Sequence, residues 1–313
     1  MNKSARIYVA GHTGLVGSAL VRYLSARGYT NILTKTHQEL DLTDRLKTEE
    51  FFRQERPEYV FLAAAKVGGI FANNKYPADF IYQNIIIQTN VIDLSYRYGV
   101  KKLMFLGSSC IYPKNCSQPI KEEYLLSGHI EPTNKPFAVA KIAGIEMCQA
   151  YNRQYGTNFI SVIPANVYGV NDHFGTQNSH VIASLITRFH EAKIAGHDCV
   201  TIWGTGSPMR EFFYVDDLAD GCVFIMDNYN DNEIINIGTG MDTAIKELAC
   251  LIKELVGFKG KIVYDTTQPD GIPRRLLDIS KIASLGWKAE TGLKEGLKLT
   301  YEYYIESTQA LKS

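Results

Sequence analysis

The first residues with a pattern suited to ligand binding form a glycine-rich run near the start of the chain. Gly11, Gly14 and Gly17 follow apolar residues 6–10 and lie at the start of residues 11–24, where apolar side chains recur at helical spacing. In such a strand–turn–helix unit, the first glycine makes the tight turn and the second lets backbone approach a pyrophosphate. The third lets the helix pack closely on the strand. The helix N-terminus then offers free N–H groups to the phosphates, so the run predicts a dinucleotide site.

The spacing of the three glycines is GxxGxxG, which resembles the extended branch of the short-chain dehydrogenase/reductase family. The resemblance implies cofactor contacts from the turn, from the ends of the following strands and from the start of a later helix. The expected cofactor-binding residues are Gly11, Thr13, Gly14, Leu15, Val16, Gly17, Lys35, His37, Asp41, Leu42, Ala64, Lys141, Asn166, Val167 and His180.

The end of the second expected strand, residues 31–34, distinguishes between the two nicotinamide cofactors. An acidic residue there would hold a ribose 2′-hydroxyl, whereas cations accept a 2′-phosphate. Lys35 and His37 follow this strand, and no acidic residue occurs before Glu39. The sequence therefore favours NADPH. The alternative is that these cations belong to a solvated loop without a cofactor.

A serine, a lysine and the residue four positions before the lysine point to reductive chemistry. Hydride addition to a ketone leaves an alkoxide, and a tyrosine can protonate it if a cation one helical turn away lowers the tyrosine pKa. The resembled reductases use Ser, Tyr and Lys, with the serine on the carbonyl oxygen and the lysine also on the nicotinamide ribose. Ser108 and Lys141 fit this set, but Phe137 stands at the tyrosine position and has no proton to give.

Two explanations of Phe137 remain open. Either the residue is a deliberate Tyr→Phe change that would trap a bound substrate, or the chain is a natural member that lost or rerouted reduction. The expected residue types around it favour the first explanation, because a decayed site would not keep them. We expect the chain to fold and bind its ligands but to reduce slowly.

Cys110 and His180 suggest a second kind of chemistry at the same carbonyl. Cys110 lies two residues after Ser108, and His180 opens an expected helix. Several long strings around these residues resemble the GDP-L-fucose synthase family, and the resemblance covers nearly the whole chain. These strings are residues 63–70, 76–84, 107–114, 131–134, 178–182 and 208–212.

This resemblance implies NADPH-dependent epimerisation at C3 and C5 of GDP-4-keto-6-deoxy-D-mannose, followed by reduction at C4. Both carbons adjoin the ketone, so one group can remove each acidified proton and another can return one to the opposite face. The resemblance assigns Cys110 and His180 to this pair. A buried structural thiol and a structural histidine are the simpler alternatives.

Two rival functions stay open. The chain could reduce another GDP-keto sugar, such as a 3,6-dideoxy or heptose analogue, with or without epimerisation. It could instead be a nucleotide sensor without catalysis, which only Phe137 supports. A metal centre is not expected, because His173 and His180 have no third ligand at suitable spacing.

The later part of the chain offers groups for a nucleotide sugar. Guanidinium groups bind a diphosphate in bidentate fashion, and an indole packs on a base or a ribose. For each arginine the alternative is an ordinary surface charge. The expected substrate-binding residues are Ser108, Ser109, Cys110, Asn166, Arg188, Trp203, Arg210, Arg275 and Asp278.

These residues must be positioned by alternating strands and helices. Apolar strand-like runs alternate with helix-like runs through the first half, which predicts a parallel sheet with helices on both faces. We expect an α/β fold: a Rossmann-type doubly wound parallel sheet with a smaller C-terminal α/β substrate domain. Residues 1–165 would form the NADP-binding domain, to which later segments return, and residues 166–313 would mainly bind the GDP-sugar.

Composition narrows the class of protein further. The 313 residues carry 33 lysines and arginines against 33 aspartates and glutamates, so no overall charge suggests a nucleic-acid or membrane partner. Six scattered cysteines without a CxxC pair suggest reduced thiols and a cytoplasmic location. The resemblance also implies a homodimer through residues 79–98 and the helix that follows Lys141.

Overall fold

Five strands from residues 7–164 and a sixth from residues 235–237 form a six-stranded parallel sheet in the computed structural model, which describes residues 1–175, 179–268 and 270–310. Its strands, in spatial order, are β2 (Ile32–Leu33), β1 (Ile7–Ala10), β3 (Tyr59–Leu62), β4 (Lys102–Leu106), β5 (Phe159–Pro164) and β9 (Ile235–Ile237). In this register Ile7 on β1 is paired with Ile32 on one side and Tyr59 on the other. The order of strand addition reverses at β1, and ligands bind at such switch points in open parallel sheets.

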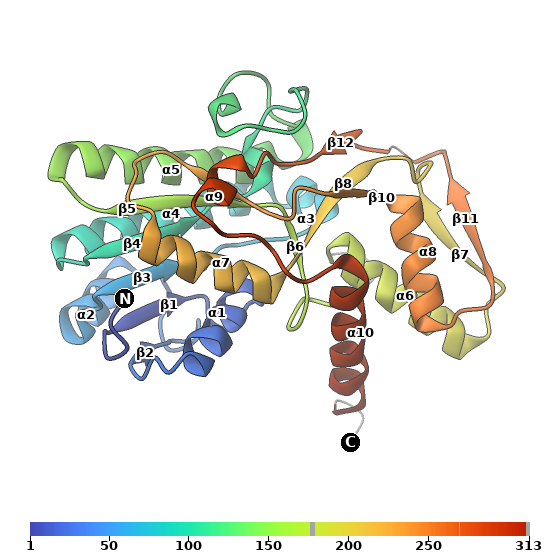
Figure 1. Cartoon of the computed structure of the whole chain (residues 1–313), viewed down its shortest axis with the longest axis horizontal. Coiled ribbons are helices and arrows are strands. Elements are labelled where there is room, and N and C mark those ends of the chain that lie inside the picture. The colour runs from blue at the N-terminus through green and yellow to red at the C-terminus, as the bar shows by residue number, and fades with distance from the viewer. Residues whose placement is uncertain (176–178, 269, 311–313) are drawn as a thin grey trace.

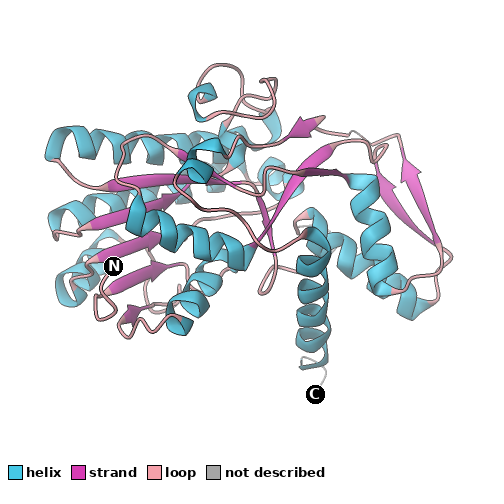
Figure 2. Cartoon of the chain, in the orientation of Figure 1, coloured by secondary structure: helices cyan, strands magenta, loops and turns pink. Residues whose placement is uncertain are grey.

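Helices cover both faces of this sheet (Figures 1 and 2). The long helix α4 packs along α5, whereas α1 packs on α7. The helices of this part are α1 (Leu15–Ala26), α2 (Arg45–Glu55), α3 (Ile70–Lys75), α4 (Pro77–Arg97), α5 (Lys135–Tyr155) and α7 (Val215–Asn228). The predicted doubly wound parallel sheet is therefore confirmed.

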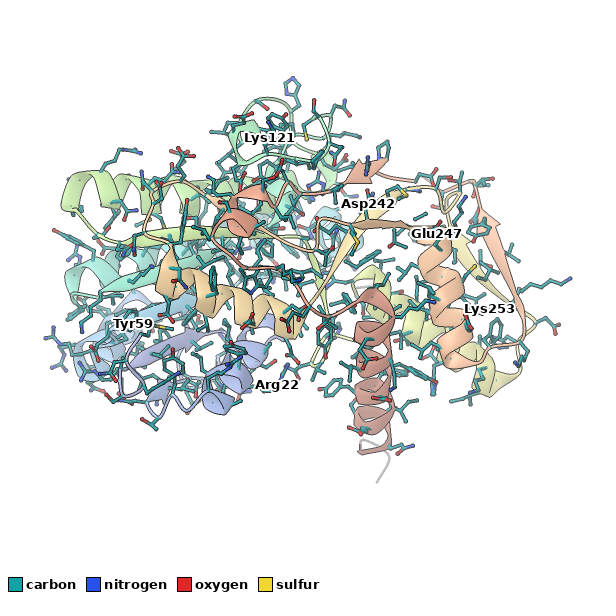
Figure 3. All side chains as sticks on the ribbon, in the orientation of Figure 1. Arg22, Tyr59, Lys121, Asp242, Glu247 and Lys253 are labelled. Carbon is teal, nitrogen blue, oxygen red and sulfur yellow. The ribbon has the colours of Figure 1, made fainter. Side chains whose placement is uncertain are left out.

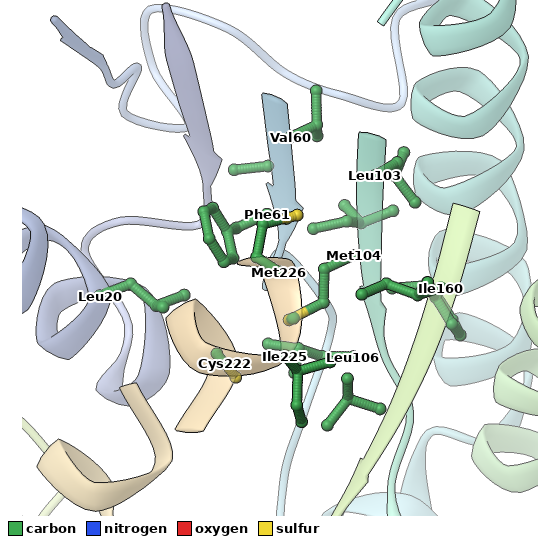
Figure 4. Packing of buried hydrophobic residues seen from close by; sticks show 14 of the residues in the cluster. Leu20, Val60, Phe61, Leu103, Met104, Leu106, Ile160, Cys222, Ile225 and Met226 are labelled. Atoms are coloured by element: carbon green, nitrogen blue, oxygen red, sulfur yellow. The ribbon is translucent and has the colours of Figure 1, made fainter. Parts of the chain in front are cut away.

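The core of this part lies between the sheet and the helices packed on it. Figure 4 shows side chains of β3 and β4 meeting those of α1 and α7. The strands are buried on both faces, as their continuous apolar sequence predicts. Each large side chain buried in this way stabilises the fold by about 1.5–3 kcal/mol. Labelled members of the cluster are Leu20, Val60, Phe61, Leu103, Met104, Leu106, Ile160, Cys222, Ile225 and Met226.

A second, smaller part is built from residues after 165 and has its own hydrophobic cluster. Its larger sheet has the order β10-β8-β12, with β6 also paired to β8, and β7 pairs separately with β11. The elements are β6 (Asn166–Tyr168), α6 (Val181–Ala195), β7 (Cys199–Trp203), β8 (Met209–Tyr214), β10 (Asp242–Ala244), α8 (Ile245–Val256), β11 (Lys261–Asp265), β12 (Arg274–Arg275) and α10 (Leu293–Ala310).

The chain passes between the two parts more than once. After β8 it returns to the first part as α7 and β9, and β9 pairs with β5 through Val162 and Ile235. Short elements line the connections: η1 (Ser109–Ile111), η2 (Glu122–Tyr124), η3 (Pro132–Asn134) and α9 (Ser280–Ser284). The segment containing Lys121 stands out above the sheet in Figure 3. Across the described ranges, none of the helices combines the length and the apolar character needed to cross a membrane.

Candidate functional site

The glycine-rich turn lies at the switch point, pressed against the end of β3. A Cβ on Gly11 would lie 2.7 Å from the amide nitrogen of Ala64, and one on Gly17 would lie 2.1 Å from the Gly11 carbonyl oxygen. Gly11 also has a φ of +84°, which favours glycine. Gly14 is the N-cap of α1, with no side chain to cap the helix and no acidic residue in its first turn. The first N–H groups of α1 are therefore suited to an anion.

The residues next to Gly14 and the loop after β2 complete this end of the site. Thr13 is exposed, and Leu15 and Val16 are half-buried. His37 is exposed, with its Nδ1 3.9 Å from a carboxylate oxygen of Asp41. Leu42, which follows Asp41, is buried.

Glu39 is the first acidic residue after β2, and its carboxylate is already bonded. It accepts hydrogen bonds from the backbone amide and the hydroxyl of Thr36, both at 2.7 Å. These bonds lower the pKa of Glu39. Lys35 is half-buried and His37 is exposed in this loop, and their role toward a phosphate stays a prediction.

Ser108 and Lys141 meet at the carboxyl end of β4. Ser108 caps η1, and its hydroxyl lies 3.5 Å from the amide nitrogen of Cys110. The Lys141 ammonium donates to the Leu106 carbonyl at 2.8 Å and lies 5.8 Å from the centre of the Phe137 ring. Burial lowers the pKa of Lys141 to about 8. The predicted spacing thus places a buried cation beside an apolar ring that has no proton to donate.

Cys110 joins this group from η1, and Arg275 reaches it from β12. Burial raises the pKa of the Cys110 thiol, while the Ser108 hydroxyl and the charges of Arg275 and Lys141 lower it. The Arg275 guanidinium donates to the Ser109 carbonyl, the residue just before Cys110. We call Ser108, Cys110, Lys141 and Arg275 the thiol cluster.

His180 is the N-cap of α6, so the predicted helix start is confirmed. Its Nδ1 lies 3.5 Å from a carboxylate oxygen of Asp172, a buried residue, and hydrogen bonding to Asp172 raises the pKa of His180. The imidazole itself is half-exposed. Asn178, which belongs to the sequence string quoted with His180, lies outside the described residues. His173 is exposed and its amide donates to Asp172.

The predicted substrate residues of the second part fall into two groups. Arg210 and Arg275 are partners across β8 and β12, and burial together with the Arg275 charge lowers the pKa of Arg210 to about 10. Asn166 lies next to them on β6 and donates to the Glu211 carbonyl at 2.9 Å, while Val167 pairs with Phe213.

The other group lies farther along this part. Arg188 on α6 donates to the Thr201 carbonyl and lines a cavity of about 240 Å³. Trp203, at the end of β7, is 66% exposed, which leaves its indole face accessible. Asp278 belongs to neither group, because it follows β12 and its amide donates to the Ile120 carbonyl at 2.8 Å. Its carboxylate accepts from the Ser280 amide at 2.8 Å at the start of α9.

Two acidic residues near these groups were missed by the sequence reasoning. Asp172 is recognised only through its contact with His180. Glu211 is fully buried on β8, and its carboxylate accepts from the amides of Thr239, Gly240 and Leu277 at 2.6, 2.8 and 2.9 Å. The sequence signal for Glu211 was an acidic residue within the apolar run of β8, because a buried carboxylate needs hydrogen-bond donors around it.

Comparisons with known proteins agree with this arrangement. The model of the NAD dependent epimerase/dehydratase family matches residues 7–238. GDP-L-fucose synthase 1 of Arabidopsis thaliana is 59% identical over 306 residues, which are 98% of this chain and 95% of the relative. The resemblance inferred from the sequence strings is thereby confirmed.

Two solved structures share the whole architecture. A GDP-6-OMe-4-keto-L-xylo-heptose reductase from C. jejuni is 43% identical, with a TM-score of 0.94 over 98% of this chain and 99% of that one. A GDP-L-fucose synthetase from Naegleria fowleri bound to NADP is 27% identical, with a TM-score of 0.91 over 99% and 96% of the two chains. Both of these structures therefore share the two-part fold of this chain.

Proposed function

The chain belongs to the NAD-dependent epimerase/dehydratase family, and from this premise we propose that it converts GDP-4-keto-6-deoxy-D-mannose to GDP-L-fucose with NADPH. The conversion comprises epimerisation at C3 and C5 and reduction at C4. The observation that carries the proposal is the thiol cluster at the end of β4, where a thiol, a hydroxyl and a buried lysine meet. Full-length similarity to a GDP-L-fucose synthase supports the same substrate.

NADPH supplies the hydride for C4 and fits the residues around the glycine-rich turn. Backbone segments lie very close together at Gly11 and Gly17, and no side chain caps the start of α1. Both features suit the pyrophosphate of NADPH. In this proposal Lys35 and His37 hold the 2′-phosphate, and Lys141 holds the nicotinamide ribose. The remaining positions line the adenine and nicotinamide ends: Thr13, Leu15, Val16, Asp41, Leu42, Ala64, Asn166, Val167 and His180.

The epimerisation uses Cys110 and His180 as its acid/base pair. Ser108 polarises the C4 carbonyl, which acidifies the protons on C3 and C5. One of the pair removes each proton, and the other returns a proton to the opposite face. The Asp172 carboxylate keeps the His180 imidazole protonated to higher pH, which suits the returning role.

The reduction is slowed by Phe137, because the ring beside Lys141 has no proton for the C4 alkoxide. The chain then holds an epimerised keto sugar that is reduced slowly. Its GDP moiety is bound mainly by residues 166–313, with Arg188, Trp203, Arg210 and Asp278 among the contacts. Ser109 and Arg275, also expected to bind the substrate, are bonded to each other beside the sugar carbonyl site. NADPH is bound mainly by the first part of the fold. This part consists of residues 1–165 and of the segment of α7 and β9 that returns to it.

We also propose a homodimer through α4 and α5. Tyr82 on α4 is 64% exposed, and Tyr96 on α4 stacks on Tyr155 of α5 with ring centres 4.2 Å apart. Both stacked rings are partly exposed as well. Large aromatic side chains exposed along one helix pair are typical of an interface.

A GDP-heptose 4-reductase is the second candidate function. The C. jejuni structure, with its TM-score of 0.94, supports it, although that protein is less similar in sequence than the plant synthase. A 4-reductase that does not epimerise would take up no deuterium next to the ketone, so an exchange experiment separates it from the first candidate.

The test measures deuterium uptake at C3 and C5 of GDP-4-keto-6-deoxy-D-mannose in deuterated water with bound NADP. This step does not need the missing phenol of residue 137. We expect uptake at both carbons in the chain as it stands, and a loss of about 100-fold or more in Cys110→Ser and His180→Gln. His173→Gln is the matched control, since His173 is exposed beside Asp172, and it should exchange normally. No uptake by the folded parent chain would contradict the proposal.

A further inference from the structure

Arg275 is a buried cation that joins the two parts of the molecule at the thiol cluster. Its side chain is only 6% exposed, and its guanidinium donates to the Ser109 carbonyl, 166 residues away in sequence. Ser109 lies between Ser108 and Cys110, whose own contact forms the start of η1. One bond from Arg275 therefore holds the turn that carries the thiol.

The backbone that carries Arg275 is itself fixed on both sides. The Leu276 amide donates to the Gln118 side chain at 2.8 Å, and the Ile120 amide donates to the Leu276 carbonyl at 2.7 Å. The Leu277 amide donates to the buried Glu211 carboxylate at 2.9 Å. This segment cannot shift without breaking several hydrogen bonds, so the guanidinium has a defined position.

The charged and titratable groups around the thiol come from three sides. Cys110 faces Ser108 on its own turn, Lys141 from α5 and Arg275 from β12. Arg275 in turn interacts with Cys116 and Glu131 from the segment before α5 and with Arg210 from β8.

The two cations beside the thiol differ in the pH up to which they keep their positive charge. Burial lowers the pKa of Lys141 to about 8, so that lysine begins to lose its charge near neutral pH. A guanidinium does not deprotonate in this range. Arg275 therefore keeps its positive charge beside Cys110 at pH values where Lys141 loses its own.

We propose that Arg275 is a positioning residue for the epimerisation, holding the turn of Cys110 in place and favouring the thiolate form of its sulfur. The thiolate takes a proton from the carbon next to the ketone: the C–H bond breaks, the S–H bond forms, and the electron pair remains in the enolate. A proton returned to the opposite face completes the inversion without any redox change. The substrate in this step rests on the proposed function, whereas the effect on the thiol does not.

The test is the pH dependence of iodoacetamide alkylation of the ligand-free chain, read peptide by peptide. Tryptic cleavage after Lys114 separates Cys110 from Cys116, so their rates are measured independently. Cys110 is 9% exposed, whereas Cys148 and Cys222 have no exposed surface and become reactive only if the fold opens. They report folding in the same sample.

We expect Arg275→Gln to move the midpoint of Cys110 alkylation upward by about one pH unit, which lowers its rate about tenfold at neutral pH. Arg275→Lys keeps the charge and should restore most of the rate. Arg274→Gln is the matched control, because Arg274 is exposed and paired with Asp242, and it should leave the midpoint unchanged. If Arg275→Gln does not fold, Arg275→Met is used instead, and we expect the same upward shift of the Cys110 midpoint and the same loss of rate.

An unchanged Cys110 midpoint in a folded Arg275→Gln or Arg275→Met variant would overturn the proposal. A second measurement, deuterium exchange at C3 and C5, should show at least a tenfold slower rate in the same variant near neutral pH. If the parent chain exchanges no deuterium, the proposed substrate is wrong, yet the alkylation result still decides the effect of Arg275 on the thiol.

Discussion

Phe137 and Lys141 lie one turn apart on α5, and only the lysine can take part in proton transfer. Restoring the phenol by Phe137→Tyr should raise the rate of reduction by about 10²- to 10⁴-fold, because an acid would again lie near the alkoxide. NADPH oxidation in a single turnover measures this change.

Phe137→Leu is the matched control, since it changes the shape of the side chain without adding a hydroxyl, and it should give no gain. The same rate for the phenol variant and the parent chain would mean that reduction takes its proton from another group. The ring of Phe137 packs edge-on against Phe80 with centres 6.3 Å apart, so the position is defined by packing as well as by chemistry.

The Asp172–His180 pair gives a pH prediction at the same scale. The carboxylate raises the pKa of His180, so the imidazolium persists to higher pH than in a free histidine. Asp172→Asn should therefore make His180 lose its proton earlier and move the alkaline limb of the exchange profile to lower pH by about one unit. Asp216→Asn, which alters a half-exposed acid paired with Arg22, should not move it. An unmoved limb in Asp172→Asn would show that His180 does not supply the proton.

Local spacing allowed most of these residues to be predicted. Ser108 and Cys110 share one turn, and Phe137 and Lys141 share one helix face, so short-range geometry brings each pair together. The bond from Arg275 to Ser109 spans 166 residues, and no local pattern predicts it. The sequence placed Arg275 only among the diphosphate-binding candidates, because a cation's partner depends on how distant strands pair.

Among the elements, α7 depends on a lysine from a neighbouring strand for its C-terminal end. Lys102 on β4 is buried and donates to the carbonyls of Met226 and Tyr229 at 2.6 and 2.5 Å. Cations at a helix C-terminus satisfy free carbonyls and the helix dipole. The contact thus attaches α7 to the sheet.

Lys102→Met should lower the free energy of unfolding by about 1–3 kcal/mol, because buried carbonyls would lose their donor. Urea unfolding measures this loss. The adjacent Lys101→Met is the control: Lys101 is exposed and pairs with Glu58, so its change should stay within about 1 kcal/mol. Equal effects for the two variants would argue against a specific role of Lys102.

The helix and strand boundaries show which elements sequence patterns alone can predict. The apolar run 103–106 predicts a strand, and residues 78–98 predict a helix. The structure has β4 at Lys102–Leu106 and α4 at Pro77–Arg97, because burial on both faces and helical periodicity are local signals. The expected strand at residues 31–34 is only Ile32–Leu33. The short strands β10 and β12 exist because they pair with β8, and neither has an apolar pattern of its own.

For the whole molecule, the exposed tyrosines of α4 and α5 lead to a prediction about assembly. Tyr82→Lys should shift the mass in solution from dimer toward monomer, since a charge would have to be buried in the interface. Light scattering after size separation measures the shift. Leu46→Lys, at a 78% exposed position on α2, is the control and should leave the mass unchanged. A dimer that persists in Tyr82→Lys would place the interface elsewhere.

The return of β9 to the first sheet has a consequence for synthesis on the ribosome. β5 ends at Pro164 and its outer partner begins at Ile235, about 70 residues later. At 5–20 residues per second, the outer edge of β5 waits roughly 4–14 seconds for that partner to be translated. An apolar edge left open for so long can pair with other nascent chains, so during translation this protein should rely on chaperones to shield that edge.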